Sequence, residues 1–273
     1  LPFPLARNFG LLPSLFLYPV FIMKYLLITM AVMLLAGCGG SQSINNIHNV
    51  AAYQDAEALK KILDSGVNIN KKNLLGMTAL HEAVDKNNLQ TFEFLLSRDA
   101  DVNATDFAGT SALHMISQLG NLDLAKKLLS KGAKVNVKQL NGKTPLLFAV
   151  DFGKLDIAEL LIQNNANVND ADNDKWTILH AASQEGYVNI VKKIISIDSM
   201  NINSKEKMYG MTPLHSASAF GHNETIELLL TKNASINMTD NNGNTALDFA
   251  KMKNQDATIL FLQKRGGKTG EEL

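Results

Sequence analysis

The sequence predicts an all-α repeat solenoid, in which pairs of short helices stack along one axis. Two markers recur in one register over most of the 273 residues. Successive copies of the first marker are 33, 33, 33, 35 and 33 residues apart, and a regular period of this size indicates stacked units. Its copies read TALH, SALH, TPLL, TILH, TPLH and TALD, and they end at His81, His114, Leu147, His180, His215 and Asp248. The second marker is the asparagine that closes each copy: Asn70, Asn103, Asn136, Asn169, Asn203 and Asn237.

Each copy predicts two short helices. The first follows the Thr-x-Leu-His segment and carries small residues, as in HAAS at 180–183, and a glycine or asparagine then ends it. The second carries adjacent apolar residues, such as Leu128-Leu129. One helix pair cannot bury its apolar face alone, so neighbouring pairs must stack. We therefore expect about seven units over residues 46–263, with a degenerate first copy around His48 and a polar last copy as caps.

Composition and motifs exclude several classes of function. The 26 basic and 26 acidic residues balance, so no net field draws the chain to nucleic acid or to acidic lipid. The single cysteine, Cys38, excludes an intrachain disulfide and a cysteine-based zinc site. No nucleophile elbow, Walker loop, HExxH segment or calcium-loop spacing occurs, and Asp151, Asp156 and Glu159 read as a solvated helix face. We expect a protein that is not an enzyme and has no metal or cofactor; the remaining alternative is an enzyme whose site no motif reveals.

The segment that begins at Met23, MKYLLITMAVMLLAGCGGS, has the layout of a secretory signal peptide. A basic residue precedes an apolar stretch that is too short to span a bilayer, and small residues follow it. The quartet Leu35-Ala36-Gly37-Cys38 resembles the lipobox of bacterial lipoproteins. That resemblance implies cleavage before Cys38 and a diacylglycerol on its thiol. It would anchor the protein in the bacterial cell envelope, facing the periplasm.

This interpretation divides the N-terminal region into three parts. We expect residues 1–22 to be an upstream extension absent from the product, 23–37 to be the signal peptide, and 38–45 to be the lipidated cysteine with a short tether. The alternative is a single membrane-spanning anchor from Leu11 to Ala36. It would contain Pro13 and Pro19 and would bury Lys24 at a cost of about 2.5–3.5 kcal/mol, so we favour the lipoprotein.

The repeat resembles the ankyrin repeat. The ankyrin pattern G-x-T-P-L-H-x-A-A-x-x-G is matched closely from Gly210 to Gly221, and the resemblance covers residues 46–263, which leaves 264–273 as a polar tail. It implies antiparallel helix pairs whose connecting loops project as β-hairpin fingers. It also implies that each repeat histidine hydrogen-bonds a nearby hydroxyl and ties adjacent turns together. The hydroxyl residues are Thr78, Ser111, Thr177 and Thr212.

Regularly spaced histidines could instead bind metal or relay protons. Packed helices lie about 8–10 Å apart, whereas zinc needs imidazole nitrogens at about 2.0–2.1 Å. Two successive histidines therefore cannot share one ion without collapsing the stack. Leu147 and Asp248 would also interrupt a relay, whereas a stack tolerates them. We predict that the histidines are architectural.

The ankyrin resemblance implies three groups of partner-contacting positions: the finger tips, the residue after the finger glycine, and the end of the first helix. In this chain they would expose an apolar strip of the kind found in protein interfaces. The alternative for each side chain is that it folds back on the neighbouring finger. We expect Trp176 and Tyr209 to be the main anchors. The tips are Leu74, Leu75, Phe107, Leu140, Met208 and Tyr209; the second group is Met77, Trp176 and Met211; the helix ends are Leu119, Phe152 and Phe220.

The copy between His180 and His215 contains two extra residues. One of them lengthens the finger from Ser204 to Thr212, which has Met208 and Tyr209 at its tip. This longer finger is either a specialised contact or the result of drift in a loop that tolerates insertion.

Together these features predict a non-enzymatic protein–protein interaction module, monomeric and held at the membrane through lipidated Cys38. Such a tethered binder would be an immunity protein against a toxic enzyme that reaches the periplasm, or a scaffold for an envelope enzyme. The alternative is an effector that is secreted into a host cell and binds host proteins. Lipid on Cys38 would distinguish the envelope protein from the effector.

Overall fold

The computed structural model describes residues 47–53, 56–196 and 200–273. The predicted extension (1–22), signal peptide (23–37) and tether (38–45), with the lipobox cysteine Cys38, lie outside the described residues. From Ile47 onward the chain forms one compact unit. Within the described ranges, no helix is both long enough and apolar enough to cross a membrane.

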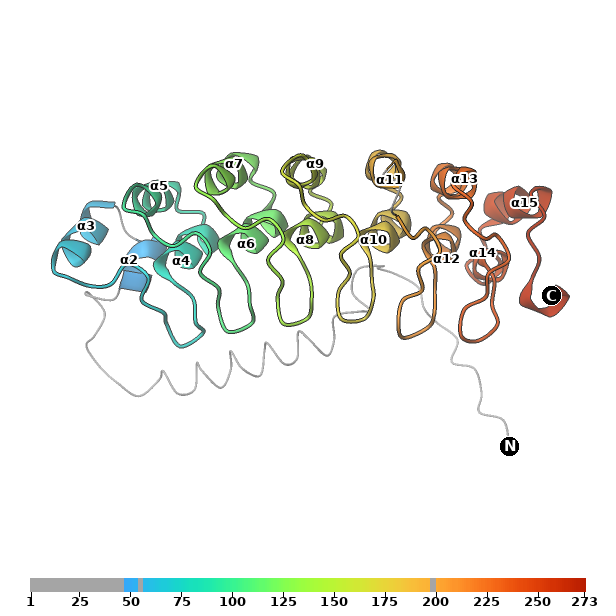
Figure 1. The fold of residues 1–273 in the computed structure, drawn as a ribbon, viewed down its shortest axis with the longest axis horizontal. Helices are drawn as coiled ribbons and strands as arrows, with labels where there is room; N and C mark the ends of the chain where they lie inside the picture. Colours follow the sequence, from blue (N-terminus) through green and yellow to red (C-terminus); the bar gives the residue numbers. More distant parts are fainter. Residues whose placement is uncertain (1–46, 54–55, 197–199) are drawn as a thin grey trace, which may run out of the picture. The chain divides into compact units, whose positions relative to one another are not determined.

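Fourteen α-helices in the described part of the chain form seven consecutive pairs, which confirms the predicted all-α solenoid. The first helices of the pairs lie in one row and the second helices in another (Figure 1). Each first-row helix packs against the next helix of that row. The first row is α2 (Ile47–Tyr53), α4 (Ala79–Asp85), α6 (Ala112–Leu119), α8 (Pro145–Asp151), α10 (Ile178–Glu185), α12 (Pro213–Ala219) and α14 (Ala246–Met252). The second row is α3 (Ala56–Asp64), α5 (Leu89–Ser97), α7 (Leu122–Ser130), α9 (Leu155–Gln163), α11 (Val188–Ile195), α13 (Asn223–Thr231) and α15 (Asp256–Lys264), and a short 3-10 helix, η1 (Gly270–Glu272), follows.

Local sequence signals set the ends of the first-row helices. A threonine precedes α8, α10, α12 and α14, and its hydroxyl accepts the backbone N–H three residues later. This bond satisfies a donor that has no partner inside the helix. Pro145 and Pro213 occupy the first helical position, where a missing N–H costs nothing. Gly120 and Gly186 end α6 and α10 with φ of 89° and 69°, a conformation that only glycine adopts without strain.

Aliphatic and small side chains fill the space between neighbouring pairs. One residue of each predicted apolar doublet is fully buried: Leu95, Leu128, Leu161, Ile194 and Leu229. The core cluster among the described residues runs from Ile47 to Leu262. The unit therefore contains a core of its own and can fold without the residues that precede it.

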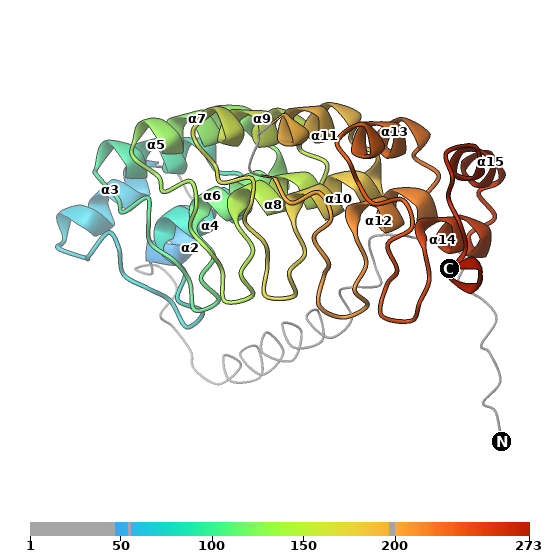
Figure 2. The ribbon, with the colours of Figure 1, turned by 45° about the vertical axis from the view of Figure 1, so that its right-hand side comes forward.

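Six loops, here called fingers, connect the second helix of each pair to the first helix of the next. They project from one side of the unit (Figures 1 and 2). Their residues are 71–77, 104–110, 137–143, 170–176, 204–211 and 238–244. Within the described ranges only two isolated β-bridges form, between Thr105 and Ser111 and between Ala171 and Thr177. The expected hairpin fingers are hairpin-shaped loops without regular strands, because each arm is too short to add further pairs.

The repeat histidines join each pair to the next, as the sequence predicted. Their Nδ1 atoms accept the backbone N–H of the preceding Thr or Ser and lie 2.7 to 3.0 Å from its hydroxyl oxygen. Nε2 therefore carries the proton, and it donates to a backbone carbonyl of the next repeat at 3.0 to 3.2 Å. The four pairs of imidazole and carbonyl are His81 with Thr110, His114 with Lys143, His180 with Met211, and His215 with Asn244.

Asp248 occupies the histidine position of the last repeat and performs a similar role. Its Oδ2 accepts the Thr245 N–H at 2.9 Å and the Gly270 N–H at 2.7 Å. The Thr245 hydroxyl in turn donates to the Lys268 carbonyl at 2.6 Å. These bonds hold the C-terminal segment, residues 264–273, against α14.

The closing asparagines form a second line of bonds between repeats. The side-chain oxygen of Asn136 accepts the N–H of Asn167 at 2.8 Å, and its amide donates to the Asn165 carbonyl at 3.3 Å. Asn103, Asn203 and Asn237 each make the corresponding two bonds. The second sequence marker recurs because its side chain bonds the backbone of the following copy.

Burial makes the histidine bonds sensitive to acid. It lowers the pKa of His81 and His215, and it lowers the pKa of His114 and His180 to about 4. In the unfolded chain a histidine titrates near pH 6.5. Between pH 6.5 and 4 the unfolded state therefore binds more protons than the folded state, and stability falls as the pH falls.

We expect acid to destabilise the protein by roughly 2 kcal/mol for each of His114 and His180 between pH 7.5 and 4.5. Urea unfolding at these two pH values measures the loss. The double variant His114→Gln, His180→Gln should show a smaller difference between the two pH values, although it is less stable at both. An equal pH difference in the wild type and the variant would contradict this assignment.

Candidate functional site

Four finger tips carry large apolar side chains that are exposed to solvent. Their exposed fractions range from 51% for Tyr209 to 76% for Leu74. The tips of the fourth and sixth fingers are polar instead, with Asp174 and Asn241 exposed. We call the row of six tips the finger edge. Its exposed apolar residues are Leu74, Phe107, Leu140, Met208 and Tyr209.

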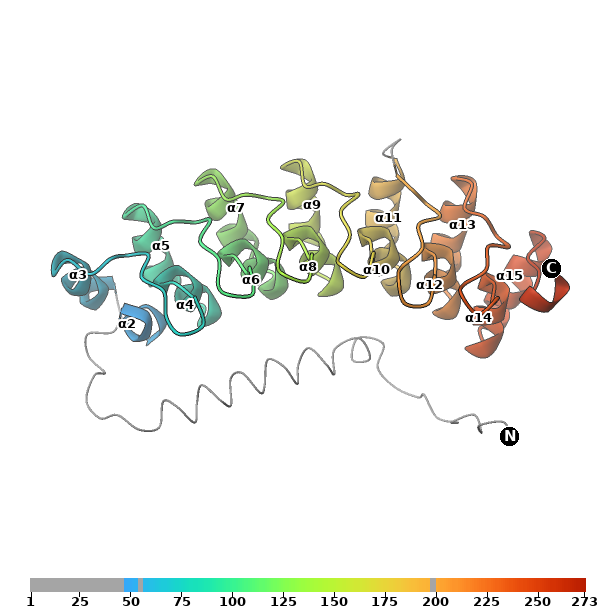
Figure 3. The same ribbon diagram turned by 60° about the horizontal axis from the view of Figure 1, so that its bottom comes forward.

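Backbone hydrogen bonds join each finger to the next. The Phe107 N–H donates to the Leu75 carbonyl at 3.1 Å, and the Leu140 N–H donates to the Ala108 carbonyl at 2.9 Å. The view from the finger side shows the loops next to one another (Figure 3). Later fingers repeat the bond: Asn173 to Asn141, Lys207 to Asp174, and Asn241 to Tyr209. The finger edge is therefore one hydrogen-bonded row rather than six independent loops.

This close approach explains the glycines of the first and third fingers. Gly76 and Gly142 have φ of 80° and 83°, and a β-carbon at either would lie 2.7 to 2.8 Å from the backbone nitrogen of Phe107 or Asn173 in the next finger. Lys175 replaces the glycine of the fourth finger and keeps a positive φ of 60°. A left-handed conformation costs about 1–2 kcal/mol in a residue with a β-carbon.

Four of the predicted contact residues in the fingers are half-buried: Leu75, Met77, Trp176 and Met211. The Trp176 ring stacks on the His180 imidazole with a centroid distance of 5.0 Å and packs against the core. Much of its surface thus supports the junction between repeats. Tyr209, the other predicted anchor, is exposed at its tip.

The ends of three first-row helices present apolar side chains at equivalent repeat positions. Leu119 ends α6 and is half exposed, and Phe152 follows α8, with its ring 6.0 Å from that of Phe148. Phe220 follows α12 and is half-buried. We call Leu119, Phe152 and Phe220 the helix-end surface. It belongs to the helices, whereas the finger edge belongs to the loops.

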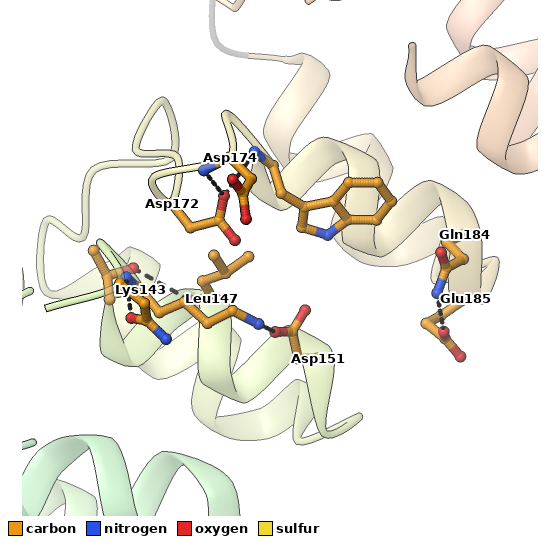
Figure 4. A network of polar contacts seen from close by, with 10 residues as sticks. Lys143, Leu147, Asp151, Asp172, Asp174, Gln184 and Glu185 are labelled. Carbon is orange, nitrogen blue, oxygen red and sulfur yellow. Dashed lines mark hydrogen bonds and ion pairs between the residues drawn. The ribbon is translucent and has the colours of Figure 1, made fainter. Parts of the chain in front are cut away.

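The junction between α8 and α10 differs from the others because Leu147 replaces the repeat histidine. Leucine cannot donate to the carbonyl of the next repeat. A polar network lies beside it, in which Lys143 extends past Leu147 to Asp151 (Figure 4). The Lys143 Nζ lies 2.6 Å from the Asp151 carboxylate, and both side chains are less than one-fifth exposed.

The expected solvated face of Asp151, Asp156 and Glu159 is therefore wrong for Asp151. Asp156 is exposed and Glu159 is half-buried, whereas Asp151 lies in a half-buried ion pair. Burial raises the pKa of the Asp151 carboxyl, and the Lys143 ammonium beside it acts in the opposite direction. Such a pair requires both partners, because either charge alone would be costly to bury.

Most fingers close on a short acceptor side chain at the start of the turn. The Asp106 carboxylate accepts the N–H of Ala108 at 2.8 Å and that of Thr110 at 2.7 Å. Asn73, Asp172 and Asp240 accept the corresponding pairs of backbone donors in their own fingers. These acceptors point back into their loops.

The longer fifth finger uses glutamate at this position. The buried Glu206 carboxylate accepts three backbone N–H groups, from Met208 and Tyr209 at 2.6 Å and from Met211 at 3.1 Å. Its longer side chain spans the additional residue of the loop. The inserted residue and the change from aspartate to glutamate thus form one adaptation, which keeps Met208 and Tyr209 in an ordered turn.

The sequence did not predict the roles of Glu206 and His222. Glu206 sits in a highly charged segment, SKEK, where its loop-closing role is hidden among neighbouring charges. The His222 Nε2 donates to the Gln184 carbonyl of the preceding repeat at 2.9 Å, outside the regular histidine register. The described residues contain no group of three or more His, Cys, Asp or Glu side chains placed to hold a metal ion.

A family model described as ankyrin repeats (3 copies) matches residues 47–139, 113–206 and 191–270. The chain belongs to the ankyrin-repeat family. It is also similar to the crystal structure of the human ASB11 ankyrin repeat domain, at 28% identity and a TM-score of 0.65. That match covers 79% of this chain and 96% of the ASB11 chain. Ankyrin repeats are modules that bind other proteins.

Two curated relatives match shorter segments. The human transient receptor potential cation channel subfamily A member 1 is 34% identical over 90 residues, which are 33% of this chain and 8% of the channel. The mouse 85/88 kDa calcium-independent phospholipase A2 is 34% identical over 84 residues, which are 31% of this chain and 10% of that protein. The chain thus spans a tenth or less of these relatives, and the phospholipase match is a match between repeats. The ankyrin fold itself is typically non-catalytic.

We expect Glu206→Asp to loosen the fifth finger, because the shorter carboxylate cannot reach all three N–H groups. A buried donor left without a partner costs about 1–3 kcal/mol. Urea unfolding should show a loss in this range, and amide hydrogen exchange should accelerate at Met208, Tyr209 and Met211. Glu57→Asp, on the exposed surface of α3, is the matched control and should change neither readout. Unchanged exchange in Glu206→Asp would contradict the loop-closing role.

Proposed function

We propose that this chain is a non-enzymatic binding protein, anchored by lipid on Cys38 in the bacterial envelope, that holds or inhibits another protein in the periplasm. The ankyrin fold supports the binding role. The lipobox quartet Leu35-Ala36-Gly37-Cys38 supports the anchor. An immunity protein and a scaffold for an envelope enzyme are the two forms of this function.

The helix-end surface is the proposed contact for the partner protein. Leu119 and Phe152 occupy equivalent positions on adjacent helices, and both are exposed apolar side chains next to polar neighbours such as Gln118 and Glu185. An apolar centre with a polar rim is the usual anatomy of a protein interface. The Phe148 ring stacks on Phe152 and limits its rotation, which lowers the entropy lost on binding.

The anchor is tested by metabolic labelling of the full chain with a palmitate analogue in a bacterial host. We expect label on the wild type and none on Cys38→Ser, together with a mature N-terminus at Cys38 in mass spectrometry. Cys38→Ser should leave the protein unprocessed, because cleavage of lipoproteins follows lipidation. An unlabelled wild-type chain would overturn the envelope assignment and favour the secreted effector.

The partner surface is tested by affinity capture from an envelope extract. We expect the triple variant Leu119→Ala, Phe152→Ala, Phe220→Ala to lose the captured partner, since central apolar anchors contribute about 2 kcal/mol each to binding. The matched control is Leu89→Ala, Leu260→Ala, which removes exposed leucines from α5 and α15. Equal capture by both variants, at equal thermal stability, would exclude the helix-end surface.

A further inference from the structure

The finger edge combines exposed apolar groups with an excess of exposed positive charge. Its five apolar tips come from the first, second, third and fifth fingers. Within the six fingers, the only exposed carboxylate is that of Asp174. The exposed lysines are Lys71, Lys72, Lys138, Lys175, Lys205 and Lys207. The exposed side chains of the edge are therefore mostly basic, although the six fingers together contain seven lysines and six acidic residues.

This asymmetry has a structural cause. The finger carboxylates Asp106, Asp172, Glu206 and Asp240 turn inward to accept backbone N–H groups of their own loops. Lysine has no such bond to make inside a finger, because it carries no acceptor. Two of the lysines instead reach along the edge, where the Lys72 Nζ lies 2.7 Å from the Thr105 carbonyl and the Lys205 Nζ 2.6 Å from the Thr239 carbonyl. The closure of the fingers thus turns four of the six finger carboxylates inward; Asp170 pairs with Lys138 at 2.8 Å, and Asp174 is exposed.

We propose that the finger edge docks on an anionic lipid bilayer. Leucine, phenylalanine, methionine and tyrosine tips would enter the interfacial layer, and the lysines would contact the acidic headgroups. The hydrogen bonds between fingers present the tips as one preformed row, so several shallow contacts act together. This surface is separate from the helix-end surface, which stays available to a protein partner.

The charges argue against a second copy of the chain as the occupant. If two finger edges faced each other, the exposed lysines of one copy would lie against those of the other. Each copy would offer only one exposed finger carboxylate, that of Asp174, to pair with them. A lipid surface that carries many acidic headgroups complements the same lysines. The test therefore separates three outcomes: lipid, a second copy, or neither.

The test uses residues 46–273, which contain a complete core and lack Cys38, so that no lipid anchor contributes. We expect this fragment to sediment with vesicles of phosphatidylglycerol and phosphatidylethanolamine, and to bind phosphatidylcholine vesicles about tenfold less. Leu74→Ser, Phe107→Ser, Leu140→Ser should reduce binding by about tenfold. Lys71→Gln, Lys72→Gln, Lys207→Gln should reduce it similarly and weaken its dependence on salt. The control Leu89→Ser, Leu260→Ser, on second-row helices, should bind as the parent does.

Labelling defines which surface touches the lipid. The fragment contains no cysteine, so Leu140→Cys and Leu260→Cys each accept a single environment-sensitive fluorophore. We expect its emission to rise with vesicles only at position 140. No binding to anionic vesicles, or equal binding by the tip variant, would overturn the proposal. A dimer detected by light scattering and abolished by the tip variant would assign the edge to a second copy instead.

Discussion

Side-chain hydrogen bonds from each repeat to the backbone of the next hold this protein together. A single helix pair has only a fraction of a core, and apolar contact alone does not set the register between pairs. The histidine Nε2 atoms and the closing asparagines set it by bonding fixed carbonyl and N–H groups about thirty residues further along the chain. The neutral imidazole is essential to this arrangement, because its two nitrogens must accept on one side and donate on the other.

Those bonds also explain what the sequence predicted well. A residue that must bond the next copy recurs once per copy, so His114 and Asn136 mark the period directly. This period predicted the number of helix pairs, and the ankyrin resemblance of the copies predicted the role of the histidines. The surfaces were harder, because exposure depends on which way a side chain turns. Trp176 and Tyr209 are both aromatic residues at predicted contact positions, but the Trp176 ring stacks on His180 whereas the Tyr209 ring is exposed. Asp151 likewise forms an ion pair with Lys143, eight residues earlier in its own repeat, instead of facing solvent.

The α8–α10 junction is an exception to the histidine rule. Leu147 is fully buried and adds apolar contact where other repeats place a hydrogen bond, and the Lys143–Asp151 pair lies next to it within one repeat. Packing thus holds α8 against α10, whereas an imidazole bond crosses the junction that follows each of His81, His114, His180 and His215. Apolar contact is less directional than a hydrogen bond, so the register of these two repeats depends on the bonds of Asn136 and on the backbone bond from Asn173 to Asn141.

The fifth finger shows how an ankyrin array can change loop length without losing order. Glu206 exceeds aspartate by one methylene, and the loop it closes exceeds its neighbours by one residue. The longer side chain matches the longer loop, and the finger keeps its backbone hydrogen bonds to the fingers on both sides. The two changes can therefore be transferred together. A glutamate and one added residue, introduced into the finger of another repeat, would lengthen that finger in an ordered way. A chosen side chain at its tip would then project beyond the tips of the neighbouring fingers.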